Sequence, residues 1–494
     1  MLKEKRSSND LKYGKTMNRP YHKKAGNGWI LCLAWLFLAG CAAVGPDYVP
    51  PEKEVSSQWQ TRLKGGLAGE SIDQETLSRW WQTLNDPALS RLMEEAVAGN
   101  LDLKEARARV REARARRGIE DAGLFPYMDA SGKILRSQGS EETGAGTERT
   151  LYTAGFDAGW EVDIFGGVRR SIEAANAELE ASEASLRDVL VTLTAEVALN
   201  YLEMRTYQAR LAVAEGNLKA QEETYQLTRW RFQAGLSDAL SMEQARYNLE
   251  STRSQIPTLR SGLEASQNRI AVLLGKEPGE LRTELATSAP IPVTPLRVAV
   301  GIPADCIRRR PDIRQAEREL AGQTARIGVA TADLYPKFSL LGSIGLEALS
   351  FGKLASSDGM TYSIGPTFSW RLFDAGAIRQ NINVQTALQD QALARYESAI
   401  LSALEEVENA LKAYAEEQNR RAALKEASDA AQQAVKLAEN KFEAGIIDFN
   451  VVLDAQRSRL SFEDQLAQSE GAVTTHLITL YKALGGGWSE MAAE

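Results

Sequence analysis

The sequence contains only two histidines, His22 and His476, and three cysteines among 494 residues. Histidine-dependent catalytic triads and metal sites built from several histidines therefore lack the residues that they need. No glycine-rich phosphate-binding loop is present either. Paired carboxylates are frequent, but they fall in helical stretches, where they are typical of a solvated face. These absences predict a protein that is not an enzyme and that has neither a metal site nor a cofactor.

Two long stretches lack helix-breaking residues. Residues 377–444 contain neither glycine nor proline, and residues 168–234 contain a single glycine, Gly216, and no proline. Hydrophobic residues recur every seven positions in both stretches, which is typical of coiled-coil helices. At about 1.5 Å per residue, each helix would be roughly 100 Å long. The heptad positions are Leu190, Val197, Met204, Leu211 and Leu218 in one stretch and Leu393, Ile400, Val407 and Tyr414 in the other.

The two stretches belong to a repeat with an offset of 210 residues, the distance from Leu190 to Ile400. The same offset relates motifs on either side of them. The pairs are Phe125-Pro126 with Tyr335-Pro336, Trp160 with Trp370, Phe232-Gln233-Ala234-Gly235 with Phe442-Glu443-Ala444-Gly445, and Leu274-Gly275 with Leu484-Gly485. The sequence therefore predicts an internal duplication, in which each half is one structural unit.

A basic segment followed by a hydrophobic one opens the chain. Lys23 and Lys24 precede a run from Trp29 to Leu38 that is too short to span a membrane. The run ends in Leu38-Ala39-Gly40-Cys41, which resembles a bacterial lipoprotein signal. Residues 1–40 are therefore predicted to be removed, with translation starting at Met1 or Met17, and Cys41 to carry a covalent lipid. The alternative is an ordinary secretory signal that contains a cysteine.

Removal of residues 1–40 would make the chain more acidic. It eliminates eight Lys or Arg and two Asp or Glu, which takes the net charge from −8 to −14. An acidic chain is not expected to bind nucleic acid. Cys306 would be the only free thiol, so we expect no internal disulfide, and stability must come from packing or from assembly.

Hydrophobicity alternates with a period of two residues between the helical stretches. In residues 152–164, Tyr152, Phe156 and Trp160 share one face, and residues 361–372 repeat the pattern. Each half would have two strands joined by polar loops, 138–149 and 348–359, which suits a transmembrane β-barrel. A soluble amphipathic sheet is the alternative. Because four strands cannot close a barrel and open edges are not tolerated in lipid, we expect three copies to share twelve strands.

The predicted segments are a signal peptide (1–40), a lead-in (41–85), a first repeat (86–279), a linker (280–305), a second repeat (306–488) and a tail (489–494). Trp59, Trp80 and Trp81 are the expected anchors of the lead-in. The fold class is mixed α/β, with barrel strands and long helices, and the resemblance described next implies that the helices form a long helical barrel that continues the strands. The first repeat would hold one helix from Asp86-Pro87 to about Ala122, a hairpin (127–164), a long helix (168–234) and a return helix (239–274) kinked at Pro257. The second repeat would hold a helix from Pro311, a hairpin (337–372), a long helix (377–444) and a return helix (450–484).

Motifs between residues 38 and 488 are similar to those of the TolC-like outer membrane factors. The resemblance is to the NodT- and OprM-like lipoprotein branch, which works with resistance-nodulation-division (RND) efflux pumps. It implies a homotrimer, with a twelve-stranded barrel in outer membrane lipid and a twelve-helix tunnel through the periplasm. It also implies two partners, a periplasmic adaptor protein and an inner-membrane RND transporter. The motifs are Leu38-Ala39-Gly40-Cys41, Val44-Gly45-Pro46-Asp47-Tyr48, Trp160-Glu161-Val162-Asp163-Ile164-Phe165-Gly166, Arg309-Arg310-Pro311-Asp312-Ile313-Arg314-Gln315-Ala316-Glu317, Leu453-Asp454-Ala455-Gln456-Arg457 and Tyr481-Lys482-Ala483-Leu484-Gly485-Gly486-Gly487-Trp488.

The resemblance further implies where such a channel closes. Asp454 matches the position whose carboxylates ring the periplasmic aperture, and Arg457 matches a neighbouring arginine. Relatives outside this branch carry a second aspartate where this chain has Val451. The residues alone leave open a plain ion pair between Asp454 and Arg457 on a helix surface. The tip turns at which the adaptor docks match Gly235, Leu236, Gly445 and Ile446.

These features predict the outer membrane channel of a tripartite efflux system. Such a channel is a passive, gated exit duct for small molecules, and its inner-membrane partner supplies the energy. Two alternatives stay open from the sequence: the outer membrane duct of a type I protein secretion system, and a lipid-anchored periplasmic coiled-coil scaffold. The strands favour a channel, because a scaffold has no need of a hydrophobic face that suits lipid.

Overall fold

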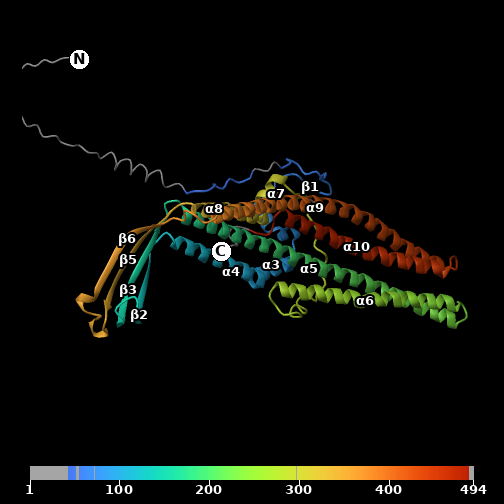
Figure 1. Ribbon diagram of the computed structural model, residues 1–494. Coiled ribbons are helices and arrows are strands. Elements are labelled where there is room, and N and C mark those ends of the chain that lie inside the picture. Colours follow the sequence, from blue (N-terminus) through green and yellow to red (C-terminus); the bar gives the residue numbers. More distant parts are fainter. Residues whose placement is uncertain (1–42, 52–54, 72, 296, 489–494) are drawn as a thin grey trace, which may run out of the picture. The chain divides into compact units, whose positions relative to one another are not determined.

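The structure, a computed structural model, describes residues 43–51, 55–71, 73–295 and 297–488. The chain divides into two units, residues 1–42 and 43–494, and the first lies outside the described residues. In the part of the chain that is described, no helix combines the length and the hydrophobicity needed to cross a membrane. Figure 1 shows the second unit, with its long strands at one end of the long helices and the turns that connect paired helices at the other end.

The first helical region is two helices, so the predicted single helix from Asp86-Pro87 to Ala122 is wrong. Helix α3 spans Pro87–Gly99, and α4 spans Leu101–Ala122. The chain breaks at Asn100, whose Oδ1 accepts from the Leu103 N–H (2.9 Å) while its Nδ2 donates to the Leu273 carbonyl oxygen (2.9 Å). Asp86 caps α3 as expected, since its Oδ1 accepts from the N–H groups of Ala88 (2.9 Å) and Leu89 (3.1 Å).

The matching region of the second half is also divided. Helix α7 spans Pro303–Arg309 and α8 spans Pro311–Ala332, with Arg310 between them. Asn100 and Arg310 are 210 residues apart, so both halves bend at the same place.

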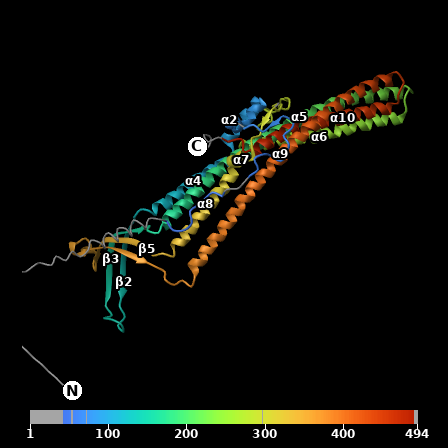
Figure 2. The ribbon, with the colours of Figure 1, turned by 90° about the horizontal axis from the view of Figure 1, so that it is seen from above.

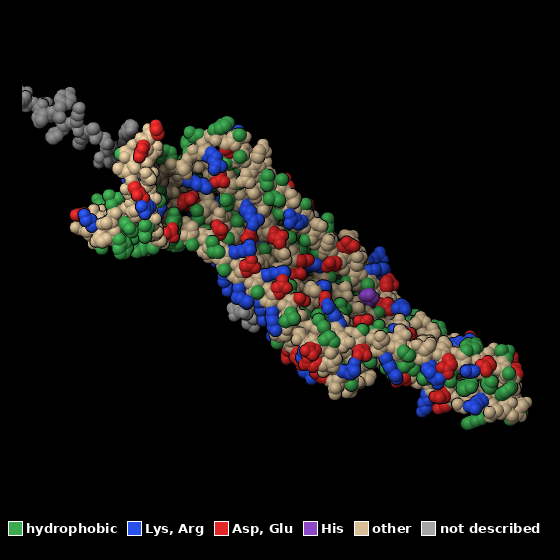
Figure 3. Space-filling view, turned by 60° about the horizontal axis from the view of Figure 1, so that its bottom comes forward, with side chains coloured by type: hydrophobic (Ala, Val, Ile, Leu, Met, Phe, Trp, Pro, Cys, Tyr) green, Lys and Arg blue, Asp and Glu red, His purple; other side chains and the backbone are tan. Residues whose placement is uncertain are grey.

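Four long strands form one antiparallel sheet in the order β2-β3-β5-β6. They are β2 (Tyr127–Gln138), β3 (Glu148–Val162), β5 (Lys337–Ala348) and β6 (Met360–Ser369). Two short 3₁₀ turns, Phe351–Lys353 and Ser357–Gly359, lie in the loop before β6. Hydrophobic side chains on the strands are exposed within a single chain, and Figure 3 shows them gathered over the sheet. Acidic and basic side chains are interspersed over the helices in the same view.

Two helical hairpins follow the strands. The first pairs α5 (Gly167–Gln233) with α6 (Ala239–Leu273), and the second pairs α9 (Ala377–Glu443) with α10 (Phe449–Ala483). All four bounds recur with the offset of 210 residues. Helix α6 continues through Pro257, and the kink expected there stays a prediction. Figure 2 shows α6 and α10 running back beside α5 and α9.

The main hydrophobic core lies where the hairpins meet the lead-in. Helix α2 spans Gln74–Ser78 and is followed by the 3₁₀ turn Trp80–Leu84. Trp80 is fully buried and stacks on Tyr481 of α10 (ring centroids 5.6 Å apart). Trp59 donates from Nε1 to the Gly301 carbonyl oxygen (2.9 Å). A short parallel pair, β1 (Leu67–Ala68) with β4 (Val298–Ala299), joins the lead-in to the linker. Trp59 and Trp80 therefore fix the lead-in against the helices, as the sequence predicts.

Residues 43–51 form an N-terminal strap along α5 and α8. The Val44 N–H donates to the Phe165 carbonyl oxygen (3.0 Å), and Arg170 of α5 binds the strap from the other side. Gly45 has φ +91°, and a Cβ there would lie 2.4 Å from the Gly328 Cα, so only glycine fits. The Tyr48 hydroxyl donates to Glu317 Oε1 (3.2 Å) on α8. The strap therefore contacts α5 of the first half and α8 of the second half.

Candidate functional site

The two hairpin turns have the same backbone structure. Gly235 and Gly445 both have φ +71°, a left-handed conformation that glycine adopts without strain. In the first turn the Leu236 N–H donates to the Arg231 carbonyl oxygen (2.8 Å) and the Gly235 N–H to that of Phe232 (3.0 Å). This pair of bonds is a Schellman motif, and it supplies hydrogen-bond donors to carbonyl groups at the end of α5 that would otherwise have none within the helix.

The second turn repeats the motif and likewise exposes an aliphatic side chain at its end. The Ile446 N–H donates to the Lys441 carbonyl oxygen (2.9 Å), and Gly445 to that of Phe442 (3.0 Å). Ile446 is 69% exposed and Leu236 of the first turn is 71% exposed. The four residues predicted for the tip turns therefore form two rigid turns, each of which presents one aliphatic side chain to solvent.

Asp238 fixes the start of the return helix α6. Its Oδ1 accepts from the Ser241 N–H (2.7 Å), and this bond holds the pKa of the Asp238 carboxyl below its ordinary value. Asp448, at the same place before α10, makes no such side-chain bond. The first turn is thus capped more fully than the second.

Arg457 on α10 reaches across to the first hairpin. Its Nε donates to Asn248 Oδ1 (3.0 Å) on α6, its Nη2 donates to the Tyr247 hydroxyl, and its guanidinium carbon lies 5.0 Å from the centre of the Tyr247 ring. The predicted alternative, an Asp454–Arg457 ion pair, does not form within the described residues. Arg457 instead ties the second hairpin to the first through charged hydrogen bonds and a cation–π contact.

Asp454 lies one turn before Arg457 and points away from the small core at this end of the hairpins. Phe449, Val452 and Leu453 of α10 pack in that core with Ala245 and Ala438. Asp454 itself is exposed and makes no hydrogen bond or ion pair within the described part of the chain. Val451, at the position of a second aspartate in some relatives, is also exposed. Asp454 is therefore an unpaired carboxylate on the exposed face of α10 within the described residues.

Other polar side chains also join the two hairpins, both next to Arg457 and farther along α10. The buried Gln456 donates from Nε2 to Thr224 Oγ1 on α5 (3.0 Å) and to Glu439 Oε1 on α9 (3.2 Å). Further along, Arg210 of α5 pairs with Asp464 of α10 (Nε to Oδ1, 2.7 Å). Helices α5 and α10 are therefore joined in this region largely by hydrogen bonds and ion pairs, which are directional and can exchange partners.

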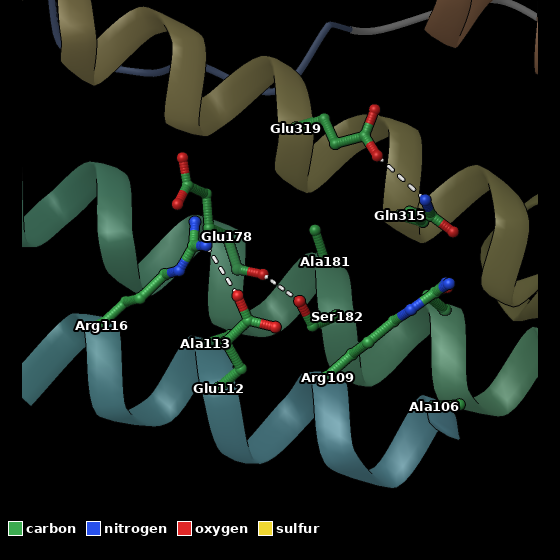
Figure 4. Close-up of a pocket in the computed structure, with 11 residues that line it drawn as sticks. Ala106, Arg109, Glu112, Ala113, Arg116, Glu178, Ala181, Ser182, Gln315 and Glu319 are labelled. Atoms are coloured by element: carbon green, nitrogen blue, oxygen red, sulfur yellow. Dashed lines mark hydrogen bonds and ion pairs between the residues drawn. The ribbon is translucent and has the colours of Figure 1, made fainter. Parts of the chain in front are cut away.

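A hollow lies between α4, α5 and α8. Figure 4 shows this hollow of about 340 Å³, in which Arg116 is paired with Glu112 (2.6 Å) and Gln315 donates to Glu319 (2.9 Å). Arg109 in the same hollow pairs with Glu105 (2.5 Å). Arg109 and Arg116 are thus bound to neighbours on α4, whereas Glu178 of α5 pairs with Arg326 of α8. The hollow is therefore a groove between helices whose charged side chains are already paired.

The sequence analysis did not single out Tyr247 and Asn248. Tyr247 is the counterpart of Arg457 at the offset of 210 residues, so that offset is the signal that could have found it. Cys41, the predicted lipid site, lies outside the described residues. Its lipid therefore stays a prediction.

Comparison with known proteins identifies the family. The family model "Outer membrane efflux protein" matches residues 92–276 and again residues 302–486. The chain belongs to the outer membrane efflux protein family. It is 33% identical to Nodulation protein T of Rhizobium leguminosarum bv. trifolii over 92% of this chain and 97% of that one. It is 31% identical to the toluene efflux pump outer membrane protein TtgI of Pseudomonas putida, with the same coverage.

The fold agrees with the family. The solved outer-membrane channel OprN is 36% identical and has a TM-score of 0.85, with 90% of this chain and all of that one aligned. As a member of the outer membrane efflux protein family, the chain is an outer membrane channel whose helices extend into the periplasm. The tip turns and Arg457 lie at the end of the helical hairpins away from the strands.

Proposed function

We propose that three copies of the chain form a passive, gated exit duct in the outer membrane. The sheet supports this proposal, because β2 and β6 each have one edge without a strand partner and hydrophobic residues such as Phe156 and Tyr362 are exposed on it. Open edges are costly in lipid, and twelve strands from three copies would close a barrel. A covalent lipid on Cys41 would anchor each copy further.

An internal duplication would extend this arrangement through the periplasm. The two family matches begin 210 residues apart, at residues 92 and 302, and the bounds of α4 to α6 recur at the same offset in α8 to α10. Three copies would then supply six similar units. Their helices would form a twelve-helix tunnel below the barrel, which needs no catalytic group and no cofactor.

The proposed partners are a periplasmic adaptor and an inner-membrane RND transporter. Leu236 and Ile446, exposed on rigid turns, offer the adaptor hydrophobic contacts at the periplasmic tip. Small molecules are the proposed cargo, and energy would come from the inner-membrane partner. One of the relatives is named for toluene efflux and another for nodulation.

The observation that carries the gate is the link from Arg457 to Tyr247 and Asn248. It joins α10 to α6 beside the exposed Asp454, at the end of the hairpins where the tunnel would open to the periplasm. Opening requires the hairpins to separate, and separation breaks this link. Arg457 therefore holds the closed state, while Asp454 narrows the aperture.

Arg457→Ala is expected to raise the open probability about tenfold or more in planar bilayers at neutral pH. A hydrogen bond to a charged group contributes about 1.5–3 kcal/mol, and about 1.4 kcal/mol corresponds to a factor of ten. The matched control is Arg246→Ala, which removes an exposed arginine on α6 that pairs only with Glu243 of the same helix (3.6 Å). Equal open probability in the two variants would contradict the role of Arg457.

Asp454→Ala is expected to raise the conductance of the closed state and to reduce its preference for cations. Three carboxylates near the axis both narrow the opening and attract cations, and alanine does neither. Glu443→Ala, which removes an exposed carboxylate of α9 near the same tip, should leave both quantities unchanged. Unchanged single-channel conductance in Asp454→Ala would place the constriction elsewhere.

A further inference from the structure

A hollow of about 720 Å³ lies beside the end of the N-terminal strap. It is larger than the groove in Figure 4 and falls in the range of about 300–1,000 Å³ that small-molecule sites occupy. Its lining comes from the strap and from helices α5, α7, α8 and α9, so both halves of one chain build it. Four arginines and three glutamates are among the lining residues, and we call this feature the arginine hollow.

The three glutamates of the arginine hollow have cationic partners within the chain. Glu180 and Glu317 both pair with Arg318 (3.1 Å and 2.6 Å). Glu183 lies 4.0 Å from a guanidinium nitrogen of Arg114 on α4. The negative charges of the hollow are therefore engaged by two arginines, and the remaining arginines of the hollow have to be considered separately.

Those remaining arginines have no carboxylate partner. Arg187, Arg308 and Arg314 form no ion pair among the described residues. Arg314 donates from Nε to the Arg308 carbonyl oxygen (3.0 Å), a bond that does not offset its charge. The Nε of Arg187 is buried and donates to no acceptor in the described part of the chain. A buried donor without an acceptor is destabilising and calls for an explanation, and a bound acceptor would supply one.

Trp488 holds two of these guanidinium groups at one place. The guanidinium carbon of Arg187 lies 5.3 Å from the centre of the Trp488 ring, and that of Arg314 lies 6.0 Å from it. Both distances suit cation–π contacts, and the ring itself is buried. Two like charges that share one ring repel each other. An anion that binds both guanidinium groups would offset this repulsion, and the planar donor fork of arginine suits a carboxylate or a phosphate.

Non-polar side chains complete the lining of the arginine hollow. Ile307, Ile313 and Tyr396 belong to one small hydrophobic cluster, and all three line the hollow. Pro50 and Pro51 of the strap line it as well. A ligand that matches both kinds of lining is an organic anion with an aliphatic part, since inorganic phosphate has nothing to place against the non-polar side chains.

The position of the arginine hollow along α5 excludes lipid head groups as its ligand. Arg187 lies about 20 residues after Gly167, where α5 begins, which is roughly 30 Å along the helix. The strands proposed to cross the membrane end just before Gly167. Head groups extend only about 5–8 Å beyond the hydrocarbon core. The anion is therefore a compound dissolved in the periplasm.

We propose that the arginine hollow binds a small periplasmic dianion of the dicarboxylate class. Arg187 and Arg314 donate to one carboxylate, and Arg308 attracts the other. The aliphatic part of the ligand lies against Ile307 and Ile313. Such a ligand joins α5 of the first half to α7 and α8 of the second. This inference goes beyond the duct proposed above and depends on the residues of one chain only, so it holds for any number of copies.

Titration calorimetry with adipate, a dicarboxylate with four methylene groups, tests the proposal. The protein is kept in neutral detergent and a chloride buffer. One adipate per chain is expected to bind saturably, and the uncharged adipamide is expected not to bind. Arg187→Met and Arg314→Met should each weaken the binding about tenfold or more, the effect of losing a hydrogen bond to a charged group. Absence of adipate binding overturns the proposal.

The matched control is Arg109→Met, which removes an exposed arginine of α4 that pairs with Glu105 outside the arginine hollow. It should leave the affinity for adipate unchanged, and an equal loss in all three variants contradicts the assigned contacts. Arg187→Lys serves as a second variant, because it keeps the positive charge but lacks the planar fork. Its affinity should stay below that of the original protein, and full affinity would show that charge alone attracts the anion.

Two further titrations identify the source of the anion. Inorganic phosphate that binds as tightly as adipate contradicts the dicarboxylate class, because the non-polar lining would then contribute nothing. A variant without residues 489–494 removes Glu490 and Glu494, the carboxylates that follow Trp488 in the sequence. Equal affinity for adipate with and without these residues supports an external ligand. Binding seen only in the shortened chain overturns it, since carboxylates of the chain itself would then compete for the arginines.

Discussion

Replacement of Arg310 with methionine is expected to lower the free energy of unfolding by about 3–5 kcal/mol, the usual cost of removing one partner of a buried ion pair. Arg310 is 8% exposed, between α7 and α8. Its Nη2 pairs with Asp312 Oδ2 (2.7 Å), and its Nη1 pairs with Glu406 Oε2 on α9 (2.7 Å) and donates to the Ala483 carbonyl oxygen of α10 (2.9 Å). One side chain thus joins three helices.

The surroundings of Arg310 increase this cost. Asp188 on α5 lies near Asp312, and burial, together with the charge of Asp312, raises the pKa of the Asp188 carboxyl above its ordinary value. The positive charge of Arg310 opposes that shift. Methionine keeps the volume of the side chain but leaves the two carboxylates near each other without the cation.

Urea unfolding in detergent, followed by tryptophan fluorescence, measures the loss. The control is Arg308→Met, which removes an exposed arginine of the same short helix, and surface changes of this kind are usually within about 0.5 kcal/mol. A midpoint for Arg310→Met equal to that of Arg308→Met would show that the three-helix junction is held by packing alone.

The long helices could be predicted from the sequence to within one or two residues because their signals are local. Absence of glycine and proline, a heptad pattern and a glycine at each end define α9, which spans Ala377–Glu443 against a predicted 377–444. The strands were also recognisable, since an alternating pattern needs no knowledge of distant contacts, but their ends were less well predicted. β3 ends at Val162 and β6 at Ser369, against predicted hairpin ends at 164 and 372. Because the motifs recur at an offset of 210 residues, a signal in one half was supported by the same signal in the other half.

The division of the first helix at Asn100 could not be predicted in the same way. Its Nδ2 donates to the Leu273 carbonyl oxygen, 173 residues away in sequence, and the hydrophobic pattern continues across the break. The strap along α5 also depends on distant partners. Arg457 illustrates the limit at the candidate site, because the sequence placed it beside Asp454, whereas its hydrogen bonds go to α6.

The second large effect is expected at the strap. Replacement of Arg170 with methionine should release residues 44–48 and raise the rate of chymotrypsin cleavage after Tyr48 about 30- to 100-fold. Arg170 is 4% exposed and donates to the Val44 carbonyl oxygen (3.1 Å), the Gly45 carbonyl oxygen (3.3 Å) and Asp47 Oδ1 (2.7 Å). Loss of about 2–2.7 kcal/mol from these charged hydrogen bonds corresponds to that factor.

The position of Arg170 makes the expected effect local. Arg170 lies in the first turn of the first long helix, so its bonds fix residues 44–47 to the start of α5. Arg210→Met is the control, because it removes an ion pair of the same helix with Asp464, remote from the strap. Mass spectrometry of the fragments locates the cut. If Arg170→Met accelerates cleavage at sites throughout the chain, or no more than Arg210→Met does, then the strap is held by Gly45 and Tyr48 rather than by Arg170.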